Sequence, residues 1–103
     1  DTNNRYTPNT AGTYLVTAVA CYNAPSDATA CNTYISKNDT AVAGTEVSNA
    51  NGSNNITTVT SVLVAMNGSS DYVDMFVYHN HGSNRNILTG NARTYLQAVR
   101  VST

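Results

Sequence analysis

The sequence predicts an all-β domain, a sandwich or jelly roll built from antiparallel strands. No segment shows an apolar period near 3.6 residues, so no amphipathic helix is indicated. Runs rich in β-branched and aromatic residues alternate with glycine, proline or asparagine breaks about every eight to twelve residues, the spacing of all-β folds. A chain of 103 residues has room for one such domain, spanning residues 1–103.

Four strands are predicted in the first half of the chain. A short strand at residues 5–7 precedes a turn at Pro8. A longer strand at residues 13–22 is rich in β-branched and aromatic residues and ends before Pro25, which cannot donate into a ladder. Residues 29–36 alternate more cleanly and form the next strand, which a hairpin turn at residues 37–40 joins to a weaker strand at residues 41–48.

The second half of the chain begins with a polar, low-complexity loop at residues 49–55. Residues 56–66 and 71–78 are predicted to form a long hairpin, with Asn67 and Gly68 supplying the positive backbone φ of its tight turn. A second polar loop covers residues 79–93, interrupted by Ile87 and Leu88, and residues 94–101 form the last strand.

Several strands carry apolar side chains on both faces. A chain this short can bury one face inside a sandwich, but the second face needs another layer, and an identical subunit can supply it. The pattern therefore predicts a homo-oligomer. The residues expected in the core or in the subunit interface are Tyr14, Val16, Ala18, Tyr72, Phe76, Tyr78 and Tyr95.

Composition excludes some partners. The chain has 5 Lys and Arg against 6 Asp and Glu. This is too little positive charge to neutralise the phosphates of a nucleic acid or to adsorb on anionic lipid, so neither partner is expected. No apolar run is long enough for a spanning helix, so membrane insertion is not expected. Cys21 and Cys31 fit either small buried thiols, which the sequence favours, or a short-loop disulfide.

The sequence shows no pattern of a catalytic site, so a non-enzymatic protein is expected. Its carboxylates are few and scattered, and Asp71 and Asp74 do not share a face of an extended strand. His79 and His81 do share a face, and in a trimer they would offer six imidazoles to a transition metal on the threefold axis. An exposed polar loop is the plainer interpretation of this pair, and no other cofactor is expected.

The loops suit recognition of sugars, because amides can pair with hydroxyl groups and aromatic rings can stack on sugar rings. Simple solvation of the loops is the alternative. The candidate ligand-binding residues come from three loops: Tyr22, Asn23, Asn51, Asn54, Asn55, Asn80, Asn84, Arg85 and Asn86.

Five segments in series resemble the jelly-roll head of C1q-like and tumour-necrosis-factor-like proteins, above all the heads at the tips of bacteriophage tail fibres. RYTP followed by AGTYLV is similar to that family's F-T-P…G-x-Y segment, and YISKND to L-Y-K-N-G. SVLVAM comes next. DYVDMFVY is similar to G-D-x-V-x-L, and TYLQAV to T-Y-F-S-G-Y, so the resemblance covers nearly the whole chain in the family's order.

The resemblance implies a C1q-like jelly roll that forms a homotrimer, with one or two further family strands preceding Asp1 in a longer fibre protein. It implies a receptor-binding tip on a virion, where the trimer recognises a bacterial surface carbohydrate such as capsule or lipopolysaccharide. A purely structural head that trimerises and caps a fibre is an alternative. A secreted adhesion or signalling head like those of complement relatives is another.

Overall fold

The computed structural model describes residues 5–23, 30–48, 55–80, 87–88 and 93–103. Their secondary structure consists of strands, which confirms the predicted all-β class. Within these ranges no helix is long and apolar enough to cross a membrane. The strands are β1 (Gly12–Tyr22), β2 (Ala30–Lys37), β3 (Thr40–Ser48), β4 (Ile56–Met66), β5 (Val73–His79), β6 (Ile87–Leu88) and β7 (Tyr95–Ser102).

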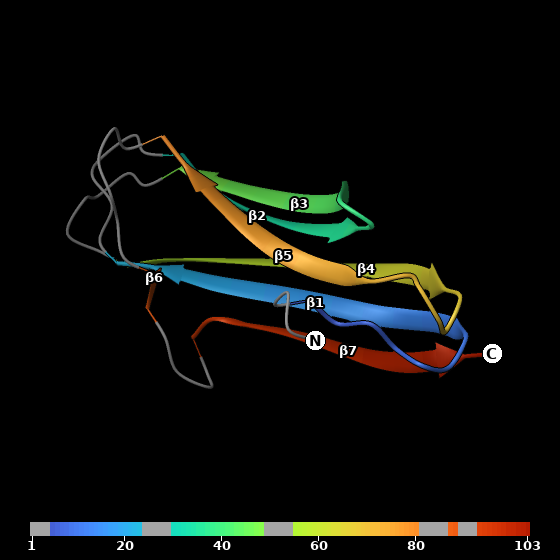
Figure 1. Cartoon of the computed structure of the whole chain (residues 1–103). Coiled ribbons are helices and arrows are strands. Elements are labelled where there is room, and N and C mark those ends of the chain that lie inside the picture. Colours follow the sequence, from blue (N-terminus) through green and yellow to red (C-terminus); the bar gives the residue numbers. More distant parts are fainter. Residues whose placement is uncertain (1–4, 24–29, 49–54, 81–86, 89–92) are drawn as a thin grey trace.

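The strands form two antiparallel sheets, as expected for a β-sandwich. In the first sheet β1 lies between β4 on one side and β7 and the short β6 on the other. In the second sheet β2 lies between β3 and β5. The two sheets are stacked as layers (Figure 1), so each has one face toward the other sheet and one face toward solvent.

The core lies between the sheets and follows the two-residue period of the strands. Tyr14, Val16 and Ala18 of β1 point inward and pack with Ile35 and Val73 of the second sheet. Beside them, Ala20, Tyr22 and Cys31 form a second buried cluster. The buried hydroxyl groups of Thr33 and Thr58 share a hydrogen bond between β2 and β4, so the two sheets are joined by polar contacts as well as by apolar ones.

The predicted hairpin between residues 56–66 and 71–78 is wrong, although both strands exist. β4 pairs with β1, and β5 pairs with β2, so the chain crosses from one sheet to the other between them. The reason lies in Asn67, whose side-chain oxygen accepts the backbone N–H groups of Ser69, Ser70 and Asp71 at 2.9, 3.0 and 3.0 Å. These bonds close a compact loop rather than a two-residue turn.

Gly68 has the positive φ that the sequence predicted, at 77°, whereas Asn67, for which the same was predicted, does not. It also lies against the chain near the start of β1, where a Cβ would come within 2.4 Å of the Ala11 nitrogen. Glycine is therefore needed here both for its backbone conformation and for close packing of two segments.

The hairpin turn between β2 and β3 is confirmed. Asn38 and Asp39 have φ values of 51° and 68°, as a turn with two left-handed central residues requires. The Asn38 side chain donates to the Asp71 carboxylate at 2.9 Å and accepts the Tyr72 N–H at 3.0 Å. The turn is thereby fastened to the loop that carries the chain from β4 to β5.

The predicted short strand at residues 5–7 is reduced to one bridge on the free edge of β5. The backbone of Tyr6 exchanges two hydrogen bonds with Val73, at 2.8 and 3.0 Å. The Arg5 guanidinium lies over the Tyr72 ring, 4.0 Å from its centre. At the other end of the chain, Arg100 is exposed and donates from Nε to the Ala11 carbonyl oxygen at 3.0 Å.

Candidate functional site

Two surfaces on opposite sides of the sandwich carry the side chains that a partner would meet. The first, here called the aliphatic face, is the outward face of β4, β1 and β7. The strand register aligns Leu63, Leu15 and Val99 across it as one row, and these side chains are 63%, 37% and 56% exposed. A row of this kind lacks hydrogen-bonding groups, so its free energy falls when it is covered by apolar atoms.

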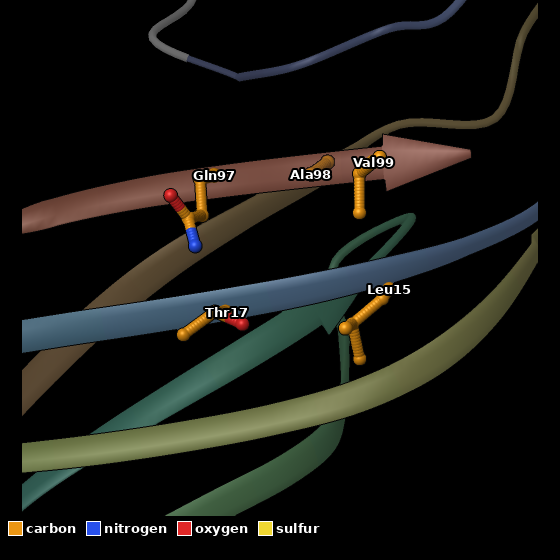
Figure 2. Close-up of a pocket in the computed structure, with 5 residues that line it drawn as sticks. All are labelled: Leu15, Thr17, Gln97, Ala98 and Val99. Carbon is orange, nitrogen blue, oxygen red and sulfur yellow. The ribbon is translucent and has the colours of Figure 1, made fainter. Parts of the chain in front are cut away.

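A polar row crosses the aliphatic face beside the first one. It consists of Ser61, Thr17 and Gln97, and the Thr17 and Ser61 hydroxyl groups are 2.7 Å apart. A hollow lies between β1 and β7, lined by Leu15, Thr17, Gln97, Ala98 and Val99 (Figure 2). Beyond it, Tyr95 lies in a third row with Val19 and Val59. The aliphatic face therefore combines apolar rows with a narrow polar band.

The second surface, here called the aromatic face, is the outward face of β3, β2 and β5. The rings of Tyr34 and Phe76 are cross-strand neighbours and stack with their centres 4.8 Å apart and their planes 19° apart. On its other side Tyr34 lies against Gly44 of β3, where a Cβ would come within 2.5 Å of the Tyr34 ring. Tyr34 therefore lies between a bare glycine backbone and the Phe76 ring.

Polar groups border these rings. Asn32 Nδ2 donates to the Tyr34 hydroxyl and to the Glu46 carboxylate, both at 3.0 Å. Asn32 Oδ1 is buried and has no hydrogen-bond partner within the described residues. On β5 the Asp74 carboxylate accepts the Ser36 hydroxyl at 2.7 Å. The aromatic face thus places carboxylates and an amide beside exposed rings.

The structure separates the residues that the sequence assigned to the core or the subunit interface. Tyr14, Val16 and Ala18 lie in the core, and Tyr95 lies half-buried on the aliphatic face. Phe76 and Tyr78 lie on the aromatic face and are 45% and 56% exposed. Tyr72 immediately precedes β5 and lies half-buried under Arg5, and a hydrogen bond to the Asp39 carboxylate raises the pKa of its hydroxyl.

Tyr22 is a core residue and is not available to a ligand at the surface. Its side chain is fully buried, and its hydroxyl donates to the Asn32 carbonyl oxygen at 2.5 Å. Burial away from water raises the pKa of this hydroxyl. The alternation of β1 explains the placement, because Tyr22 follows Tyr14, Val16, Ala18 and Ala20 on the inward face.

Three of the predicted loop residues lie at one end of the sandwich. Asn23 follows β1 and Asn55 precedes β4, and both are exposed next to the paired residues Tyr22 and Ile56. Asn80 follows β5, and its side-chain oxygen accepts the Ala30 N–H at 2.7 Å, so it fastens β5 to the start of β2. The remaining candidates, Asn51, Asn54, Asn84, Arg85 and Asn86, lie outside the described residues.

The histidine pair is placed only in part. His79 is half-buried at the end of β5, and His81 lies outside the described residues. In the part of the chain that the structure describes, no three His, Cys, Asp or Glu side chains gather as a metal site. A metal on a threefold axis stays a prediction.

Cys21 and Cys31 are both buried and unbonded in this structure. Cys31 lies in the core, whereas the alternation of β1 directs Cys21 to the outward side of the first sheet. Cys31 has no exposed surface, and burial raises the pKa of its thiol.

Sequence reasoning missed the pairing of Tyr34 with Phe76. It placed Phe76 in the core or the subunit interface because the strand carries apolar residues on both faces, and its expected hairpin paired residues 71–78 with residues 56–66 rather than with β2. The hairpin turn at residues 37–40 alone would pair Tyr34 with Ala43; the register shift between Ile35 and Ser36 puts Gly44 opposite Tyr34 instead. A glycine opposite an aromatic residue is the pattern in which a ring covers a bare backbone.

Comparison with protein-family models, with curated proteins and with solved structures finds no match to this chain.

Proposed function

We propose that this chain is the receptor-binding head of a bacteriophage tail fibre, a C1q-like jelly roll that assembles as a homotrimer and recognises a bacterial surface carbohydrate without catalysis. The observation that carries the proposal is the aliphatic face. The remaining support comes from the strand order and from the five segments that resemble the family.

The strand order supports the jelly-roll part of the proposal. The chain crosses between the sheets after β1, after β3, after β4 and after β5, so each sheet takes strands from both halves of the chain. Such repeated crossing is typical of Greek-key and jelly-roll sandwiches and differs from a simple meander. In the described part of the chain, the outer edge of β7 and the outer edge of β5 beyond Val73 are unpaired, and the family's additional strands would pair there.

The aliphatic face supports self-association. It lies on the side of β1 opposite the core, so β1 contributes side chains both to the core and to the aliphatic face. Val16 points inward, while Leu15 and Thr17 point outward. A threefold rotation brings the three copies of this row together around the axis, where they exclude water from one another. The polar row would hydrogen-bond across the same interface, which fixes the alignment of the subunits.

A trimer would make weak carbohydrate sites useful. Single shallow sites for sugars bind weakly, but three sites on one rigid head act together on a repetitive polysaccharide and gain apparent affinity. The low charge of the chain, 11% of its residues, fits a neutral ligand better than nucleic acid or an acidic lipid surface.

Two measurements test the proposal. Sedimentation equilibrium at micromolar concentration is expected to give the mass of three chains, and a stable single chain would contradict it. A bacterial glycan array, followed by binding to whole cells, is expected to show retention of the trimer on one class of capsule or lipopolysaccharide. A well-folded trimer that binds no glycan and no cell would favour the purely structural fibre cap.

A further inference from the structure

We propose that the aromatic face is a binding site for a pyranose sugar, with the exposed side of the Phe76 ring as its stacking surface and the groups around Asn32 as its polar side. The proposal rests on the proposed function, since it names the site through which the head would recognise carbohydrate. It differs from the sequence-based expectation, which placed recognition in the loops.

The stacking surface is held in place before any ligand arrives. Tyr34 is wedged between Gly44 and Phe76, and its hydroxyl accepts a hydrogen bond from Asn32 Nδ2, so the Tyr34 ring supports Phe76 from one side. In the described residues, the other edge of β5 is paired only at Val73, by Tyr6. Within the described residues no paired strand lies on the second side of the Phe76 ring, and the side chain is 45% exposed.

Sugar rings fit a surface of this kind. The C–H groups on one side of a pyranose carry partial positive charge, and the face of an aromatic ring carries partial negative charge. Phe76 and Tyr78 are two residues apart on β5 and therefore point to the same side, so Tyr78 borders the stacking surface at one end. Rigid aromatic side chains also lose little conformational entropy on binding.

Hydroxyl groups of the sugar would pair with the polar groups beside the rings. The Asp74 carboxylate lies two residues before Phe76 on the same side of β5, and the Glu46 carboxylate lies across the sheet beside Asn32. Carboxylates accept strong hydrogen bonds from hydroxyl groups. Together with the Tyr34 and Tyr78 hydroxyls, these carboxylates surround the rings with hydrogen-bonding groups. The stacking of Tyr34 on Phe76 does not itself require such groups.

Asn32 supports the proposed sugar site independently of the aromatic rings. The residue is 7% exposed, and both protons of its amide are used, but Oδ1 has no donor within the described residues. A buried acceptor without a donor is unfavourable. The cross-strand neighbour of Asn32 is Tyr78, which is mostly exposed, so in the proposed complex the Tyr78 ring turns aside and a sugar hydroxyl donates to Asn32 Oδ1.

The site and the proposed trimer contact do not compete. The aliphatic face belongs to β4, β1 and β7, and the aromatic face belongs to β3, β2 and β5, on the far side of the core (Figure 1). A trimer formed through the first face would carry three copies of the second on its outside. Binding at the aromatic face is therefore expected to leave the oligomeric state unchanged.

The test uses the whole chain and simple sugars. Methyl pyranosides of glucose, galactose, mannose and N-acetylglucosamine are titrated into ¹⁵N-labelled protein, and amide shifts of Tyr34, Gly44 and Phe76 are followed by NMR. At least one of these sugars is expected to shift those amides. Phe76→Ala and Phe76→Leu are each expected to weaken that binding by about tenfold, because neither replacement offers an aromatic face.

Glu46→Gln tests the polar side of the site and is expected to weaken binding, because the carboxylate is the stronger hydrogen-bond acceptor. Val42→Ala is the control. Val42 is 44% exposed on β3, and β2 separates that strand from Phe76. Val42→Ala is expected to leave the affinity within about twofold, as surface substitutions usually do. Binding that survives both Phe76 variants would overturn the site while leaving carbohydrate recognition intact. Failure of the wild-type chain to bind these sugars and every glycan of the array would overturn carbohydrate recognition itself.

Discussion

The two outward faces of this sandwich are built from the same kind of strand but differ in chemistry. The aliphatic face aligns Leu63, Leu15 and Val99, which can only be covered. The aromatic face combines stacked rings with an amide and two carboxylates. Aliphatic rows suit contact with an identical surface, whereas rings beside polar groups suit a ligand that has both C–H and O–H groups. In the proposed function, the first sheet would therefore serve assembly and the second would serve recognition.

The largest expected effect is on assembly. Leu63→Asp would place one carboxylate per subunit in the proposed contact, where burying an unpaired charge is costly. The mass from sedimentation is expected to fall from three chains to one. Val42→Asp, on the other sheet, is the matched control and is expected to keep the mass of three chains; if it alone dissociated the protein, the assignment of the two faces would be reversed.

The next effect concerns the ring pair. Gly44→Ala adds a Cβ that would lie 2.5 Å from Tyr34 Cδ1 and 2.8 Å from Cε1, so the ring must move. Overpacking of this kind is expected to cost about 1–3 kcal/mol. Urea unfolding measures the loss, and NMR shifts of Phe76 report the movement. An unchanged midpoint together with unchanged Phe76 shifts would show that Tyr34 does not depend on the bare backbone.

A smaller effect tests how the two sheets are held together. Thr33→Val leaves the buried Thr58 hydroxyl without its partner, and an unsatisfied buried hydroxyl costs about 1–2 kcal/mol. The double variant Thr33→Val, Thr58→Val removes both polar groups and is expected to be more stable than the single variant. Denaturation of the single and double variants measures the difference; strictly additive losses would count against the hydrogen bond.

The smallest expected effect is the pH dependence of the stability that Asp71 contributes, in the loop between β4 and β5. The hydrogen bond from Asn38, then the Asn67 N–H and Lys37, lower the pKa of Asp71. A carboxyl with a lowered folded-state pKa contributes stability above its unfolded pKa, and this contribution is lost as pH falls through the folded value. Asp71→Asn is therefore expected to be slightly less stable than wild type at neutral pH.

The measurement for Asp71 is the urea midpoint of both proteins at neutral pH and at successively lower pH. The gap between them is expected to narrow as pH falls below the ordinary pKa of an aspartate, about 3.9. A gap that stays constant over the acidic range would show that the charge of Asp71 is not what fastens the loop.

Much of the fold could be predicted because its signals are local. The strand at residues 13–22 and the turn at Asn38 and Asp39 follow from β-branched residues and from left-handed turn positions. The partner of each strand could not be predicted in the same way. Asn67 and Gly68 match a hairpin turn, yet the Asn67 side chain captures three N–H groups and closes a loop that changes sheets.

The candidate site was harder to predict because it depends on this pairing. Tyr34 and Phe76 are 42 positions apart, and only the pairing of β2 with β5 brings their rings together. The polarity of the loops pointed instead to Asn23, Asn55 and Asn80, of which Asn80 makes a structural hydrogen bond to Ala30. The sequence showed which residues are aromatic but not which ones are neighbours.

The buried position of Cys31 has a practical consequence. Its side chain has no exposed surface and its thiol has a raised pKa, so an alkylating reagent can reach a reactive thiolate only after β2 has opened. The rate at which Cys31 is labelled, measured by mass spectrometry, therefore reports how often β2 detaches from the sheet. Because β2 carries Tyr34 and Asn32, a sugar bound at the aromatic face should lower the rate of Cys31 labelling.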